Sequence, residues 1–100
     1  MSKNIKNTLS DYDIRQLSLM KNIIVSYESN KISLADLIDK LRGLLDCLQS
    51  VDASWVQSFH DSWFTLEQVY AVALDQGDTL DNYSEYIDES ILNLKILLNM

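Results

Sequence analysis

The chain of 100 residues contains no proline and only two glycines, Gly43 and Gly77. Strands and the tight turns that join them usually need more of these residues, whereas helices joined by short loops need few. Apolar residues make up 47% of the chain, as is typical of a folded globular protein. A chain of this length corresponds to one domain. These features predict a single all-α domain over residues 1–100.

Apolar residues recur at intervals of three and four along four segments, as on the buried face of an amphipathic helix. We therefore expect helices at about residues 12–29, 34–50, 53–76 and 83–99. Ser33 and Asp36 form an S-x-x-D start signal for the second helix. Gly77 is suited to end the third, because glycine adopts a left-handed conformation with little strain. Short connections place successive helices antiparallel, so the pattern predicts an antiparallel up-down four-helix bundle.

The stretch WVQSFHDSWFTLEQVY, residues 55–70, holds both tryptophans, both phenylalanines and the only histidine. On a helical wheel, the large apolar residues of this helix share an arc of about 140°, the width of a buried stripe. They are Trp55, Phe59, Trp63, Leu66, Tyr70 and Leu74. We interpret this arc as bundle core rather than as a ligand-binding box. Phe64 falls on the opposite face, where it is either an interface anchor within a polar rim or a residue covered by another segment.

The net charge of −7 is distributed unevenly. Residues 1–50 carry seven Lys or Arg and six Asp or Glu, whereas residues 51–100 carry Lys95 alone against nine acids. Nucleic acids and anionic membranes are bound by basic surfaces, so direct binding of either is disfavoured. A basic protein partner is compatible with this charge, and so is an acidic surface that serves only solubility.

The sequence also bears on location. No apolar run is long enough to cross a membrane, and the N-terminal sequence MSKNIKNTLSDYD lacks the apolar segment of a signal peptide. Cys47 has no second cysteine in the chain with which to form a disulfide. We therefore expect a cytoplasmic protein without a membrane span.

Patterns for catalysis are weak. His60 and Glu67 are seven residues apart on one helix flank, but no nucleophile accompanies them. One histidine and one cysteine do not make a zinc motif, and two glycines do not make a phosphate-binding loop. Glu85, Asp88 and Glu89 share a helix face and could hold a hard cation, although a solvated acidic face is the simpler interpretation. We expect no enzymatic activity, no cofactor and no metal.

The segment from residue 75 to residue 89 combines six acids with two tyrosines. On the fourth predicted helix, its glutamates face the same outer side as Leu92 and Ile96. Complementary charge accelerates association with a basic protein, and apolar anchors slow dissociation. This segment and the outer face of the third helix supply the predicted partner-binding residues. They are Asp61, Phe64, Gln68, Asp75, Asp78, Asp81, Tyr83, Glu85, Tyr86 and Glu89.

The sequences ISLADLIDKLRGLLDCL, VDASW, FHDSWFTLE and VYAVALD, within about residues 31–75, resemble small helical immunity proteins of bacterial contact-dependent growth inhibition systems. A looser similarity extends to the colicin immunity proteins. The resemblance implies stoichiometric binding of a cognate toxin domain in the cytoplasm of the producing cell. Such toxins are often nucleases, and the expected partner is a basic nuclease, with an enzyme that cleaves transfer RNA as one example. Because immunity interfaces differ between cognate pairs, the resemblance assigns no binding residue.

Three functions remain open at this point. The first is an immunity protein that covers the substrate-binding surface of a nuclease toxin with its acidic face. The second is another acidic inhibitor or antitoxin, including a nucleic-acid mimic. The third is a helical adaptor that homodimerises through Phe64, Leu92 and Ile96. We expect the free protein to be a monomer or a weak homodimer.

Overall fold

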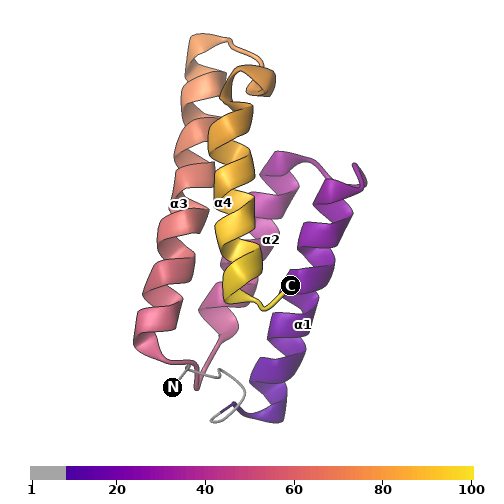
Figure 1. The fold of residues 1–100 in the computed structure, drawn as a ribbon, viewed down its shortest axis with the longest axis vertical. Helices are drawn as coiled ribbons and strands as arrows, with labels where there is room; N and C mark the ends of the chain where they lie inside the picture. The colour runs from indigo at the N-terminus through magenta and orange to yellow at the C-terminus, as the bar shows by residue number, and fades with distance from the viewer. Residues whose placement is uncertain (1–8) are drawn as a thin grey trace.

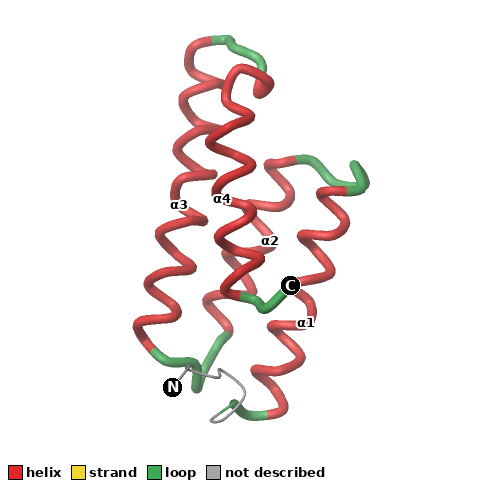
Figure 2. The backbone as a smooth tube through the Cα atoms, in the orientation of Figure 1, coloured by secondary structure: helices red, strands yellow, loops and turns green. Residues whose placement is uncertain are grey.

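The computed structural model describes residues 9–100. These residues form the α-helices α1 (Asp11–Glu28), α2 (Leu34–Cys47), α3 (Ala53–Gln76) and α4 (Ser84–Leu97). A short 3-10 turn, η2 (Leu80–Tyr83), precedes α4. Successive helices run in opposite directions, with α1 against α2 and α3 against α4 as the two most closely packed pairs (Figure 1, Figure 2). The prediction of an all-α up-down four-helix bundle is confirmed. Most of the N-terminal sequence used to predict location lies outside the described residues.

The helix ends follow local sequence signals. The hydroxyl of Ser33 accepts a hydrogen bond from the backbone N–H of Asp36 at 3.1 Å, which satisfies one of the free N–H groups at the start of α2. Gly77 follows α3 with φ of 68°, the left-handed conformation that glycine adopts without strain. Both sequence signals are therefore confirmed as helix boundaries.

The α2 helix ends at Cys47, earlier than the predicted residue 50, because the backbone N–H groups of Gln49 and Ser50 bond to Asp13 of α1 and do not continue the helix. Asp13 is fully buried, and its two carboxylate oxygens accept hydrogen bonds from the backbone N–H groups of Gln49 at 2.9 Å and Ser50 at 2.7 Å. The start of α1, where the helix dipole favours a negative charge, is thereby fixed to the α2–α3 loop. The predicted start of the fourth helix also shifts, since Tyr83 belongs to η2.

The predicted aromatic core is largely confirmed. Trp55, Phe59, Trp63 and Leu66 are all buried. The indole N–H of Trp63 donates to the backbone carbonyl of Ile38 in α2 at 2.8 Å, and that of Trp55 donates to the carbonyl of Leu97 at 2.9 Å. The two tryptophans therefore connect α3 to α2 and to the end of α4, while their rings fill the space between the helices.

The prediction that Leu74 belongs to the core is wrong, because its side chain is 70% exposed. The α3 helix has 24 residues and α2 has 14, a difference of about 15 Å at roughly 1.5 Å per residue. Figure 1 shows the α3–α4 hairpin extending past the α1–α2 connection. The α2 helix therefore covers only part of the length of α3, and Leu74 remains open to solvent.

Candidate partner-binding surface

All ten predicted partner-binding residues lie on the unit formed by α3, η2 and α4, which we call the acidic hairpin (residues 53–97). They do not form one continuous cluster. Some lie at its tip, some in a groove between α3 and α4, and the remainder along the outer faces of the two helices. The surface is therefore assembled from three regions of the hairpin.

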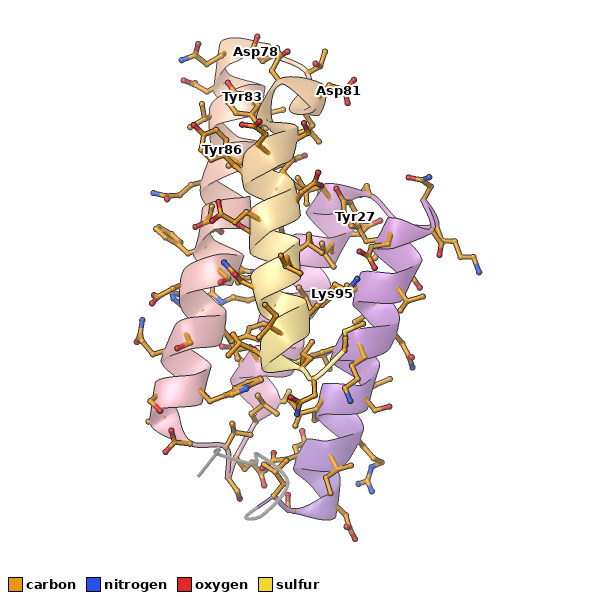
Figure 3. The ribbon with its side chains drawn as sticks, in the orientation of Figure 1. Tyr27, Asp78, Asp81, Tyr83, Tyr86 and Lys95 are labelled. Atoms are coloured by element: carbon orange, nitrogen blue, oxygen red, sulfur yellow. The ribbon has the colours of Figure 1, made fainter. Side chains whose placement is uncertain are left out.

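The tip of the hairpin carries Asp78, Asp81 and Tyr83 (Figure 3). Gly77 reverses the chain there, and the hydroxyl of Tyr83 donates a hydrogen bond to a carboxylate oxygen of Asp78 at 2.9 Å. This hydrogen bond raises the pKa of Tyr83 above its ordinary value of 10.0, and partial burial and the charge of Asp78 add to the effect. The tip thus presents two carboxylates beside a tyrosine ring whose hydroxyl is fixed.

Asp61, Tyr86 and Glu89 meet in a shallow groove of about 280 Å³ between α3 and α4. The Tyr86 side chain is 59% exposed, and the Asp61 carboxylate accepts a hydrogen bond from the amide of Gln57 at 2.9 Å. The walls also include Ser62, Thr65, Ser90 and Asn93. The groove combines one exposed aromatic ring with two carboxylates and small polar groups, a composition suited to an interface with a basic protein.

Phe64 is exposed on the outer side of α3, as its helical spacing predicts. Its ring stacks on that of His60, with centroids 6.0 Å apart and an angle of 11° between the planes. His60 also contacts the buried Trp63 at a centroid distance of 5.4 Å. His60 therefore supports an exposed aromatic side chain, and Phe64 does not line the groove that holds Asp61.

The remaining predicted residues are exposed along the hairpin. Gln68 and Asp75 lie on α3, and Glu85 precedes Glu89 by about one turn on α4. Two large aliphatic residues on α4, Leu92 and Ile96, are 55% and 62% exposed. Acids and apolar side chains are consequently interspersed on the solvent-facing side of the hairpin.

Basic residues do not neutralise these acids. Within residues 9–100, the ion pairs are Arg42 with Asp46 on α2 and Lys95 with Glu28 of α1. The hairpin's one cation is thus held by a carboxylate outside the hairpin. Asp88 lies on the α1 side, where its charge adds to the effect of burial in raising the pKa of Tyr27. The other hairpin carboxylates face solvent without a basic partner among the described residues.

The acidic residues of the hairpin do not converge on a metal site. Within residues 9–100, no three His, Cys, Asp or Glu side chains come together in a group that could hold a metal ion. Glu85, Asp88 and Glu89, the candidate cation ligands of the sequence, are each exposed. Exposed carboxylates at one-turn spacing are the arrangement of a solvated helix face.

Two features were not anticipated from the sequence. The first is the buried Asp13 carboxylate, although Ser10 and Asp13 repeat the S-x-x-D signal that marks the start of α2. The second is a groove on the other side of α3, where Leu74 lies beside Glu67. The helical wheel placed Leu74 in the core, so the sequence did not predict a groove at this position.

None of the helices in residues 9–100 has the length and apolar character needed to cross a membrane. Comparison with protein-family models, curated proteins and solved structures finds no match.

Proposed function

We propose that this protein is an immunity protein, which binds a basic nuclease toxin of a contact-dependent growth inhibition system and neutralises it. The observation that carries the proposal is the acidic hairpin, which extends past the rest of the bundle with carboxylates that no described basic residue neutralises (Figure 1). Residues 51–100 contain nine acids and one lysine. The resemblance of residues 31–75 to immunity proteins supports the same function.

The physical basis is competition for a basic surface. A nuclease must hold phosphate groups with lysine and arginine side chains, and these side chains also attract carboxylates. The exposed acids would steer the hairpin towards such a surface and accelerate association. Tyr86 and Phe64 would then act as anchors, because exposed aromatic rings lose water on contact and slow dissociation. A hairpin held in this way would exclude the RNA or DNA substrate.

The proposal is tested by co-expression with the toxin domain encoded beside this protein in the genome. We expect the wild type to restore growth and to co-purify with the toxin domain at equal stoichiometry. A variant in which four hairpin acids become amides should rescue growth poorly. Its substitutions are Asp78→Asn, Asp81→Asn, Glu85→Gln and Glu89→Gln.

A matched control removes the same number of charges from the α1–α2 half of the protein. Its substitutions are Asp11→Asn, Glu28→Gln, Asp36→Asn and Asp46→Asn. Each variant has a net charge of −3 in place of −7, so total charge alone cannot distinguish them. We expect the control to rescue growth as the wild type does. Equal rescue by both variants would remove the acidic hairpin from the interface, and absence of rescue by the wild type would refute the proposed function.

A further inference from the structure

A second groove lies on the opposite flank of α3 from Asp61, at the point where α3 begins to extend past α2. It has a volume of about 480 Å³. The residues that define it are Ala35, Ile38 and Asp39 of α2 and Glu67, Tyr70, Ala71 and Leu74 of α3. Ile38 is buried, whereas Leu74 is 70% exposed. The groove therefore has an apolar floor and an aliphatic side chain at its open end.

The exposure of Leu74 follows from the unequal helix lengths. By spacing, this residue belongs to the same stripe as Trp63, which packs against α2. The α2 helix begins at Leu34 and is shorter than α3, so its first residues line the groove with Leu74 without covering it. An exposed leucine on the core-facing arc of a helix, beside an apolar groove floor, can bury its surface against a partner.

The charge of the groove indicates which kind of segment would be complementary to it. Asp39 and Glu67 are acids on its two walls, and no lysine or arginine lines it. The two basic residues of α2, Lys40 and Arg42, do not line it, and Arg42 pairs with Asp46 and lies 5.3 Å from the centroid of the Trp63 ring. A second copy of this chain would bring a net charge of −7 to an acidic wall, which disfavours a homodimer here. A segment carrying positive charge is complementary.

We propose that this groove binds a segment of the protein partner in which an apolar side chain is flanked by lysine or arginine. The apolar side chain contacts Leu74 and Tyr70, and the basic groups contact Asp39 and Glu67. The identity of the partner as a toxin domain rests on the proposed function, whereas the chemistry of the segment rests on the groove alone. The partner would then contact both flanks of α3, with the outer acidic face on one side and this groove on the other.

The groove is tested by nuclear magnetic resonance with ¹⁵N-labelled full-length protein and a synthetic probe. The probe is a 14-residue helical peptide in which one central leucine is flanked by lysines, and its counterpart has glutamate in place of each lysine. We expect the lysine peptide to shift the amide signals of Glu67, Ala71 and Leu74, and to do so less at high salt because charges are screened. The glutamate peptide should produce no shifts there.

Two variants separate the groove from a general attraction between acidic protein and basic peptide. Leu74→Ser should weaken binding about tenfold, the loss expected for an apolar anchor. Val72→Ser is the control, since Val72 is also exposed but lies about 200° around the same helix. Both residues are exposed, so both variants should keep the thermal midpoint of the wild type, and the control should keep its peptide affinity.

The groove proposal is overturned if the lysine peptide shifts only signals of the outer faces, or if Leu74→Ser binds it as tightly as the control. A concentration-dependent dimer that Leu74→Ser abolishes would likewise overturn it, in favour of a second copy as occupant. These results are distinguishable from failure of the proposed function. If the wild type fails to neutralise the toxin but the peptide binds at Leu74, only the function is lost. If toxin binding is strong and insensitive to Leu74→Ser, only the groove is lost.

Discussion

Replacing Asp13 tests how the start of α1 is fixed to the α2–α3 loop. The side chain is completely buried, and each carboxylate oxygen accepts one backbone N–H from the α2–α3 loop, at 2.9 Å from Gln49 and 2.7 Å from Ser50. Asp13→Ala removes both acceptors. Asp13→Asn preserves the size of the side chain, but its amide group offers one acceptor and turns two N–H donors towards the second backbone N–H.

The magnitude follows from these two bonds. A hydrogen bond to a charged group contributes about 1.5–3 kcal/mol, so the pair contributes about 3–6 kcal/mol. Gln49 and Ser50 are exposed residues, and water can replace part of this interaction after the substitution. We therefore expect Asp13→Ala to lower the free energy of unfolding by about 3 kcal/mol and Asp13→Asn by about 2 kcal/mol. In a domain of this size, a loss of 3 kcal/mol lowers the melting temperature by about 12–24 °C.

Urea denaturation followed by tryptophan fluorescence measures the loss, because Trp55 and Trp63 are buried in the folded state. The control is Asp11→Asn, which removes an exposed acid from the same first turn of α1. It should change the free energy of unfolding by less than about 0.5 kcal/mol. If Asp13→Asn is no more destabilising than Asp11→Asn, the carboxylate does not hold the loop and the reasoning is refuted.

Further predictions concern the two glycines, Trp63 and Tyr83. Gly77→Ala should destabilise the protein by about 1 kcal/mol in urea denaturation, because φ is 68° there, whereas Gly43→Ala within α2 should stabilise it by about 0.5–1 kcal/mol, since nothing lies within 4 Å of the added methyl group. A stabilising Gly77→Ala or a destabilising Gly43→Ala would contradict the helix assignments. Trp63→Ala should cost about 3–5 kcal/mol by the same measurement, through loss of a buried ring and its hydrogen bond. Because the folded-state pKa of Tyr83 is raised above 10.0, its contribution to stability is complete below pH 10 and is lost as the pH rises through the folded-state value. Asp78→Asn should shift the tyrosinate absorbance titration of Tyr83 to lower pH, and an unchanged titration would exclude the Tyr83–Asp78 hydrogen bond as the cause.

Much of the fold could be predicted from local patterns. The stripe that contains Trp55, Phe59 and Trp63 reports one face of one helix, and Ser33 and Gly77 act on their immediate neighbours. Such signals depend on residues only a few positions apart, which is why the helix positions and the bundle class follow from the sequence. The end of α2 does not, since Asp13 lies 36 residues from Gln49 along the chain.

The candidate surface was predictable in its charge but not in its arrangement. The acids between residues 61 and 89 are visible in the sequence, and so is the exposure of Phe64. The meeting of Asp61 with Tyr86 and Glu89 depends on the register between α3 and α4, which no single helix encodes. A helical wheel likewise cannot tell that the helix facing Leu74 is too short to cover it.

The proposed function is tested most directly by titrating the purified toxin domain with this protein while its nuclease activity is measured. We predict that the activity falls in proportion to the added protein and disappears at one equivalent. The variant with lysine at residues 78, 81, 85 and 89 should need a large excess, because it repels the basic surface that the wild type covers. Full activity in the presence of excess wild type, or equal inhibition by the lysine variant, would contradict neutralisation by the acidic hairpin.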